Sequence, residues 1–248
     1  CLQSPAFSPV CVRTRNDEPA AEDRVARLVL TASGGPFAAQ PDIDFERVTP
    51  SQALDHPRWA MGRKVTIDSA TMMNKGLEIM EARWLFNVPA ERIGVAVHPE
   101  SIVHSLVTFV DGTQLAQLSV PDMRFPIQYA LTWPDRMTVA MPALDLVRQG
   151  RLTFEAPDES RFPCLRLARE AATIGGTLPA VLNAADEVAV EAFLSGAISF
   201  AGIWRVVEQV MAEHAVRPAA TREAIMEADA WARVAASERC GLRGTNKV

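Results

Sequence analysis

The sequence has no long hydrophobic run and few cysteines. No apolar stretch approaches the roughly 20 residues that a membrane-spanning helix needs, and no signal-peptide pattern opens the chain. The cysteines form no CxxC pair and no spacing suited to zinc or a disulfide framework; they are Cys1, Cys11, Cys164 and Cys240. These absences argue against secretion and membrane insertion, and they favour a reducing cytoplasm.

Nucleotide-binding and nucleophile motifs are also missing. No GxGxxG follows a predicted strand and no GxxxxGK[ST] occurs, so the chain carries no nucleotide-binding fingerprint. Ser33 stands in no nucleophile elbow. The net charge of -5 and the pI near 5.5 argue against a broad nucleic-acid surface, which needs clustered Lys and Arg. We therefore expect neither a nucleic-acid nor a membrane partner, and any bound phosphate should be small and locally held.

The composition that is present is typical of a folded protein. The chain has 248 residues, of which 48% are hydrophobic and 22% charged, enough for one large domain or two smaller ones. It begins with Cys1 rather than Met, and residues 4–23 show little periodicity. We expect an internal fragment of a longer protein.

Short apolar segments and one long amphipathic segment predict a mixed α/β domain over residues 1–132. Arg24–Thr31, Lys64–Ile67 and Gly94–Val97 each have the length and composition of a buried strand. Ser69–Phe86 is long enough for about four helical turns, with Asp68 or Ser69 as its N-cap. A strand, a helix and a strand in succession favour a parallel sheet.

Turn signals and helical stripes organise the rest of the chain. Asp111-Gly112 lies between two apolar segments and predicts a hairpin. Several prolines between Pro121 and Ser160 predict a short helix and then a linker, placed at residues 133–158. Residues 159–242 carry apolar stripes at spacings of three and four, which predict an all-α helical bundle domain.

Two segments have the features of anion-binding loops. Residues 32–36, Ala-Ser-Gly-Gly-Pro, follow the first predicted strand, and their glycines allow successive backbone amides to turn inward around an anion. The alternative is a tight exit from the strand. Ser69, at the predicted start of a helix, could donate to a phosphate, or it could simply cap the helix.

The predicted long helix carries the other polar candidates. Asn74 and Glu78 are four residues apart, and Lys75 and Glu78 are three apart, so their side chains can share one region of the helix surface. The alternative is a solvated ion pair worth only about 0.3–0.5 kcal/mol. Glu78 is the one credible metal ligand, and no second carboxylate is convincingly placed beside it, so the sequence predicts an incomplete metal site.

Histidines mark a loop and a strand region. Residues 56–62, HPRWAMG, combine His56 with a cation, a Trp and a Gly, and such a loop can close over a ligand or anchor itself to the core. His98 and His104 stand at the end of one strand and within the next, where histidines are more often structural than ligands.

Longer motifs follow one another in a fixed order. They are LTASGGPF, HPRWAMGRKVTIDSATMMNKGLEIMEARWLF, HPESIVHS, DGTQLAQLSVPDMRFPI, APDESRFPCLRLA and LNAADEVAVEAFL. From about residue 25 to residue 215 these motifs resemble successive blocks of the 1-deoxy-D-xylulose 5-phosphate reductoisomerase family. Residues 4–23 fit the family pattern poorly.

The resemblance implies an NADPH-dependent enzyme that converts 1-deoxy-D-xylulose 5-phosphate to 2-C-methyl-D-erythritol 4-phosphate in non-mevalonate isoprenoid biosynthesis. It implies a homodimer and a divalent metal, which could be Mg²⁺, Mn²⁺ or Co²⁺ because the same oxygen ligands accept all three. By the family's pattern the substrate, chiefly its phosphate, is surrounded by Ser33, His56, Ser69, Asn74 and Lys75, with Glu78 beside them.

The same resemblance assigns finer roles. Lys75, Glu78 and His56 correspond to catalytic positions, and Glu78 to a metal carboxylate of the family. The segment from His56 to Met61 corresponds to a closing lid. Cofactor contacts are expected at Gly62, Met61 and Met123; His104 corresponds to a further histidine near the site.

The chain also departs from the family pattern. The family places a nucleotide-binding domain and an Asp-Ser-Glu metal motif upstream of the position of Cys1, and neither is present. We therefore expect the isolated polypeptide to be inactive. The alternatives are a non-catalytic remnant that binds phosphate or dimerises, and a helical scaffold in which the bundle is the working part.

Overall fold

The computed structural model describes residues 24–56, 61–138 and 140–242, which divide into two compact units. The first unit comprises residues 24–33 and 81–157, and the second comprises residues 34–80 and 158–242. This division differs from the predicted domain ranges, because residues 34–80 group with the helical part of the chain. The physical reason is that the helix at Arg63–Thr71 packs on the helices of the C-terminal segment.

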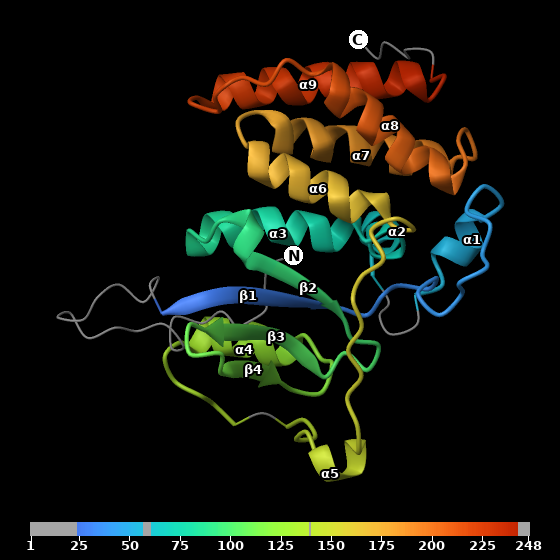
Figure 1. Cartoon of the computed structure of the whole chain (residues 1–248). Coiled ribbons are helices and arrows are strands. Elements are labelled where there is room, and N and C mark those ends of the chain that lie inside the picture. The colour runs from blue at the N-terminus through green and yellow to red at the C-terminus, as the bar shows by residue number, and fades with distance from the viewer. Residues whose placement is uncertain (1–23, 57–60, 139, 243–248) are drawn as a thin grey trace. The chain divides into compact units, whose positions relative to one another are not determined.

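The first unit is built on a sheet of four strands in the order β2-β1-β3-β4 (Figure 1). Strand β1, Val25–Ala32, pairs in parallel with β2, Ile93–Val97. Strands β3, Val103–Phe109, and β4, Gln114–Leu118, extend the sheet with antiparallel pairing. The strands predicted at residues 24–31 and 94–97 are confirmed.

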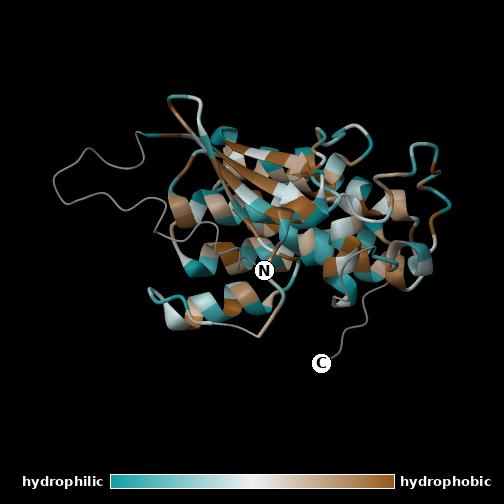
Figure 2. Ribbon diagram, turned by 90° about the horizontal axis from the view of Figure 1, so that it is seen from below, coloured by the Kyte–Doolittle hydropathy of each residue, from teal (hydrophilic) through white to brown (hydrophobic). Residues whose placement is uncertain are grey.

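The core of the first unit lies along these strands. Leu28, Leu30, Ile93, Val103 and Val107 are all buried, and the strands carry mostly hydrophobic colours in Figure 2. Strand β1 has a partner on each side, so its backbone groups are satisfied within the sheet, and its Val25, Leu28 and Leu30 side chains are buried. This explains the Val and Leu content that identified β1 in the sequence.

The predicted hairpin and the predicted short helix are both present. Gly112 has a φ of 84°, and Oδ1 of Asp111 accepts hydrogen bonds from the backbone and the hydroxyl of Thr113, which closes the turn between β3 and β4. The 3-10 helix η4, Ala90–Arg92, precedes β2. After β4 come helix α4, Arg124–Thr132, and the single-turn helix α5, Leu146–Gln149.

The strand predicted at Lys64–Ile67 is wrong, because these residues form part of helix α2, Arg63–Thr71. The helix places Ile67, Ala70 and Thr71 on one buried face, at spacings of three and four. An apolar segment of only a few residues fits a strand and a helix equally well. The parallel partner of β1 is instead β2, so the parallel sheet was predicted correctly with one wrong strand.

The helix predicted at residues 69–86 is two helices. Helix α3 spans Met73–Phe86, and Met72 separates it from α2 with a left-handed backbone, φ 63°. A residue in this conformation ends a helix, and the Met72 amide donates to the carbonyl of Ser69 as α2 closes. The predicted N-cap at Asp68 or Ser69 is therefore wrong, because both residues lie inside α2.

Helices α6 to α9 form most of the second unit and confirm the predicted bundle. They span Pro163–Ile174, Leu178–Leu194, Phe200–Glu213 and Arg222–Arg239. Gly175 and Gly176, both with positive φ, separate α6 from α7 as predicted. Helix α7 packs against α6, α8 and α9, and these helices stack in layers in Figure 1. The bundle is thus organised around one central, strongly apolar helix.

Aromatic side chains attach the loop after the glycines to the bundle. Phe37, which is 1% exposed, meets Phe200 of α8 edge to face at 5.3 Å. Phe45 packs edge to face on Trp204 at 5.6 Å, and its carbonyl accepts from the amide of Ala201. Beyond Phe45, the short helix α1, Pro50–Ala53, begins at a capping box. Edge-to-face aromatic pairs such as Phe37–Phe200 and Phe45–Trp204 each stabilise a fold by about 0.5–1.5 kcal/mol beyond the area that they bury.

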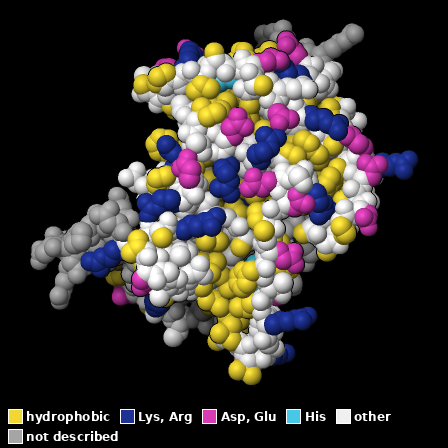
Figure 3. All heavy atoms as spheres, in the orientation of Figure 1, with side chains coloured by type: hydrophobic (Ala, Val, Ile, Leu, Met, Phe, Trp, Pro, Cys, Tyr) yellow, Lys and Arg dark blue, Asp and Glu magenta, His cyan; other side chains and the backbone are white. Residues whose placement is uncertain are grey.

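The surface of the second unit mixes both signs of charge (Figure 3). Arg166 pairs with Glu208 and Arg233 with Glu187, each at 2.7 Å, and both pairs are solvent-exposed. Exposed pairs of this kind contribute about 0–1 kcal/mol each, so the bundle is held chiefly by its apolar core. Within the described ranges, no helix combines the length and the hydropathy that crossing a bilayer requires.

Helix α3 approaches α6 closely at Gly76. A Cβ atom at this position would lie 2.3 Å from the Cβ of Ala168. We predict that Gly76→Ala lowers the free energy of unfolding, because overpacking costs about 1–3 kcal/mol and the helix propensity gained is only about 1 kcal/mol. Denaturant unfolding measures the change.

The matched control for Gly76→Ala is the double variant with Ala168→Gly, which returns the space. The double variant should recover part of the loss, so the two substitutions should be coupled in a double-mutant cycle. A higher unfolding midpoint for Gly76→Ala alone would contradict the close packing.

Candidate functional site

Three segments of the second unit carry predicted site residues: the glycine turn, the end of α2 and the start of α3. Gly34 and Gly35 have φ values of 88° and 68°, which other residues rarely adopt. A Cβ at Gly35 would lie 2.6 Å from the carbonyl oxygen of Ser69 and 3.1 Å from the Cα of Ala70. The turn therefore packs directly on the backbone of α2 beside Ser69.

Ser69 is half-buried near the end of α2 rather than at a helix start. The argument that its helix N-terminus would attract a phosphate is therefore corrected. A helix does begin nearby, at Met73, and Asn74 and Lys75 lie in its first turn. The positive end of a helix dipole, which favours a bound anion, thus lies at Asn74 and Lys75 and not at Ser69.

Glu78 holds the side chains of Asn74 and Lys75. Nδ2 of Asn74 donates to Oε1 of Glu78 at 2.9 Å, and Nζ of Lys75 donates to Oε2 at 2.5 Å. The Lys75 and Glu78 side chains are only 13% and 17% exposed. The pair is therefore more enclosed than the solvated ion pair that the spacing alone would allow, and it groups an amide, an ammonium and a carboxylate as predicted.

The described residues do not make a complete metal site around Glu78. Both oxygens of its carboxylate are engaged, one with Asn74 and one with Lys75. Among residues 24–56, 61–138 and 140–242, no group of three or more His, Cys, Asp or Glu side chains could hold a metal ion. Divalent ions such as Mg²⁺ require several oxygen ligands, so this donor set does not fit one.

The predicted lid lies partly outside the described residues, because residues 57–60 are not described. His56 is half-buried, and burial lowers the pKa of its imidazole, which favours the neutral ring at pH 7. Gly62 precedes α2, and a Cβ there would meet nothing within 4 Å. Met61 is half-buried. Neither position forms a cradle for a nicotinamide by itself.

Two predicted site residues belong to the first unit. Ser33 follows β1 directly and is half-buried. Met123 stands just before α4 and is 44% exposed. Their assignments to substrate and cofactor remain predictions.

The two strand histidines have structural partners. His98 is fully buried: Nδ1 lies 2.7 Å from the carbonyl of Thr153, Nε2 accepts from the amide of Ile102, and the ring stacks on Phe154. The rings of His98 and Phe154 are 4.6 Å apart. His104 lies 2.9 Å from Oε1 of Gln117 through Nδ1. The structural interpretation of His98 is confirmed, and the possible role of His104 stays a prediction.

Sequence reasoning missed a buried ion cluster between α2 and α7. Nζ of Lys64 lies 2.5 Å from Oδ2 of Asp68 and 2.8 Å from Oδ2 of Asp186. The side chains of Asp68 and Asp186 are 2% and 0% exposed. The spacing of Lys64 and Asp68 suits a helical ion pair, but the segment was taken for a strand, and Asp186 is distant in the sequence.

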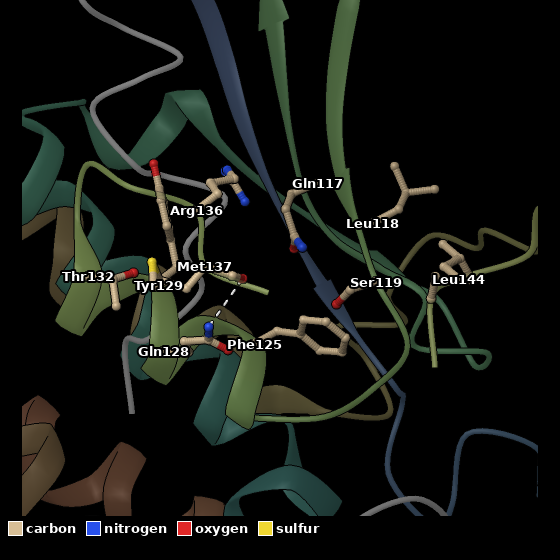
Figure 4. A pocket seen from close by; sticks show the side chains of 11 residues that line it. Gln117, Leu118, Ser119, Phe125, Gln128, Tyr129, Thr132, Arg136, Met137 and Leu144 are labelled. Atoms are coloured by element: carbon tan, nitrogen blue, oxygen red, sulfur yellow. Dashed lines mark hydrogen bonds between the residues drawn. The ribbon is translucent and has the colours of Figure 1, made fainter. Parts of the chain in front are cut away.

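A surface pocket of the first unit contains none of the predicted site residues. It has a volume of about 310 Å³ and is lined by α4, by the chain after it and by the end of β4 (Figure 4). The side chains of Gln117 and Arg136 line this pocket. Nε2 of Gln128 donates to the carbonyl of Met137. The Arg136 guanidinium lies 4.0 Å from the ring centroid of Tyr129. The family motif at residues 111–127 includes part of this lining, but no pocket was predicted there.

Two family descriptions match the sequence. "1-deoxy-D-xylulose 5-phosphate reductoisomerase C-terminal domain" matches residues 9–86, and "DXP reductoisomerase C-terminal domain" matches residues 118–235. The chain therefore carries domains of a reductoisomerase family. The match from residue 9 also corrects the expectation that residues 4–23 fit the family poorly.

Curated relatives share more than half of their aligned residues with this chain. A 1-deoxy-D-xylulose 5-phosphate reductoisomerase of Thermodesulfovibrio yellowstonii is 52% identical over 217 residues, which are 88% of this chain and 57% of the relative. One of Ralstonia nicotianae is 57% identical over 209 residues, 84% of this chain and 53% of the relative. The chain belongs to the 1-deoxy-D-xylulose 5-phosphate reductoisomerase family and spans a little over half the length of these relatives.

Solved structures agree. The chain is similar to the enzyme from Zymomonas mobilis in complex with NADPH, with a TM-score of 0.84 and 41% identity over 94% of this chain and 59% of the other. It is also similar to a DOX-P reductoisomerase in complex with NADPH, fosmidomycin and magnesium, with a TM-score of 0.83 and 41% identity over 88% of this chain and 56% of the other.

The close contact of Gly35 with α2 generates a stability prediction. A non-glycine residue in this backbone conformation costs about 1–3 kcal/mol. Gly35→Ala should lower the free energy of unfolding by more than this, because its Cβ would also meet the Ser69 carbonyl. Gly112→Ala is the matched control, since φ is also positive there but nothing lies within 4 Å of the Cβ. Equal losses in denaturant unfolding would contradict the contact.

The buried cluster generates a pH prediction. Burial, and then the neighbouring Asp186 carboxylate, raise the pKa of Asp68 from its model-compound value of 3.8 to about 8. Because the folded state holds this proton more tightly, the free energy of unfolding should fall as the pH rises from about 4 to about 8. In urea unfolding across this range, the free energy of unfolding should fall less steeply with pH for Asp68→Asn than for the parent chain. Identical slopes for the parent and the variant would contradict the raised pKa of Asp68.

Proposed function

We propose that this chain supplies the phosphate-binding part of the active site of an NADPH-dependent reductoisomerase. The reaction is the rearrangement and reduction of 1-deoxy-D-xylulose 5-phosphate to 2-C-methyl-D-erythritol 4-phosphate. Family membership supports the reaction, because the relatives are reductoisomerases of this sugar phosphate. The grouping of the Gly34-Gly35 turn, Ser69, Asn74 and Lys75 within one compact unit is the observation that carries the proposal.

The proposed roles follow from the chemistry of each group. The Gly34-Gly35 turn and the hydroxyl of Ser69 supply hydrogen-bond donors to phosphate oxygens. Lys75 supplies the cation, and Asn74 a neutral donor. When substrate binds, its phosphate competes with Glu78 for Lys75 and Asn74, which frees the carboxylate of Glu78. Binding energy gained at the phosphate can then orient the reacting carbons.

Further substrate contacts are proposed for Ser33 and for the neutral imidazole of His56. Met61, Gly62 and Met123 are the proposed contacts to NADPH, as expected from the family pattern. Solved relatives are complexes with NADPH, fosmidomycin and magnesium, and a bound divalent metal would supply Lewis-acid chemistry. The described residues provide only Glu78 toward such a metal, so we derive no step through it.

The proposal extends to the setting of the enzyme. We propose a homodimer in a reducing cytoplasm, with Mn²⁺ or Co²⁺ able to replace Mg²⁺ because hard oxygen ligands accept all three. Cys164 and Cys240 are buried free thiols, which supports a reducing compartment. Sedimentation of the purified chain would test the dimer.

Calorimetric titration of this chain with fosmidomycin tests the phosphate site. We expect weak binding that Mg²⁺ does not strengthen, since a single carboxylate cannot hold the metal. Ser69→Ala and Lys75→Ala should each weaken binding, the latter by about tenfold or more because a charge-assisted hydrogen bond contributes about 1.5–3 kcal/mol.

Arg148→Ala is the matched control for Lys75→Ala, because it removes an exposed cation from α5. This variant should bind like the parent chain. The absence of binding in a chain shown to be folded by circular dichroism would refute the phosphate site. Strong Mg²⁺-dependent binding would show instead that the carboxylates of the metal site had been misjudged.

A further inference from the structure

The ion cluster of Lys64, Asp68 and Asp186 has no part in the substrate contacts proposed above; its two carboxyl groups are buried, and the Lys64 side chain is 33% exposed. One ammonium faces two carboxyl groups, from α2 and from α7. Burying a charge is costly unless it is paired and hydrogen-bonded. A stable arrangement therefore has to account for the second carboxylate.

Several carboxyl oxygens of the cluster accept no hydrogen bond from the described residues. Oδ1 of Asp68 and Oδ1 of Asp186 are buried and accept no hydrogen bond from the described residues. Oδ2 of Asp186 has the ion pair with Lys64, although its geometry falls short of a hydrogen bond. One proton held between the two carboxyl groups supplies a donor and leaves a single negative charge opposite Lys64. The cluster is then neutral.

The surroundings supply no second cation among the described residues. Cys164 of α6 is fully buried beside both carboxyl groups, and burial raises the pKa of its thiol, so it stays neutral. Thr71 of α2 hydrogen-bonds to Cys164. Within the described part of the chain, the charges that act on Asp68 are those of Lys64 and Asp186.

The cluster lies next to the proposed phosphate site along α2. Ser69 follows Asp68 directly, and its carbonyl contacts Gly35 of the glycine turn. Any shift of this turn of α2 would move Ser69 and the surface on which Gly35 rests. Any added charge at Asp68 would also act on a bound dianion close by.

We propose that Asp186 is a positioning residue for phosphate binding: bridged through Lys64 to Asp68, it holds the Ser69 turn of α2, and the proton that the two carboxyl groups share makes phosphate affinity depend on pH. This inference rests on the phosphate site proposed above. Raising the pH removes the proton, leaves the cluster with a net negative charge and weakens the binding of an anion beside it.

The test is a ³¹P NMR titration of the 248-residue chain with glycerol 3-phosphate at pH 7.5 and pH 9.5. A phosphate monoester has its second pKa near 6, so the ligand is a dianion at both values. The parent chain should bind severalfold more weakly at pH 9.5. Asp186→Asn keeps the size of the side chain and removes the second carboxyl, so its affinity should fall less between pH 7.5 and pH 9.5 than that of the parent.

Comparison of the two chains isolates the cluster, because both keep Lys75 and every other titrating group of the site. A second variant, Asp186→Leu, removes the bridge and should weaken binding at both pH values. If Asp186→Leu does not fold, Asp186→Asn still decides. The same pH dependence in the parent and in Asp186→Asn would overturn this role alone, whereas no binding by the parent at pH 7.5 would overturn the phosphate site and this role with it.

Discussion

The left-handed turn at Met72 is the constraint on which the candidate site depends. It ends α2 and lets α3 begin in a new direction, so that Ser69 and Lys75 come from two helices. A non-glycine residue in this conformation is unfavourable by about 1–3 kcal/mol. The cost is offset by burial, because Met72 and its neighbours Thr71 and Met73 are all buried. Packing therefore holds the turn that local preference opposes.

The second unit holds two groups of charges that differ in access. The Lys75–Glu78 pair lies at the surface of α3 with part of each side chain exposed, so a ligand can compete for either partner. The carboxyl groups of Asp68 and Asp186 are sealed from solvent, and no ligand can reach them without opening the helices. The first group is suited to binding and the second to holding the helices in place. Charge alone does not separate these roles, but burial does.

The parts of the fold that the sequence predicted correctly have strong local signals. Helices α6 to α9 repeat apolar residues over several turns, and the β3–β4 hairpin contains Asp111-Gly112. Helix α2 was missed because residues 64–67 are too few to distinguish helical from strand periodicity. Its N-cap, Gly62, also makes no side-chain cap hydrogen bond. Asp186 was missed because its partners come from a distant helix, and no local pattern records such a contact.

The residues of the candidate phosphate site lie close together in the sequence, and this is why the site could be predicted. Its glycine turn, Ser69 and Lys75 all lie within residues 34–80, so short-range motifs contain most of its donors. A metal site needs several carboxylates that converge from different segments, and within the described residues Glu78 has no such companions. In our proposal, affinity for the phosphate end of a substrate is therefore separate from the chemistry at its reacting end. The first depends on a local arrangement of backbone and side chains, and the second on groups that the described residues do not bring together.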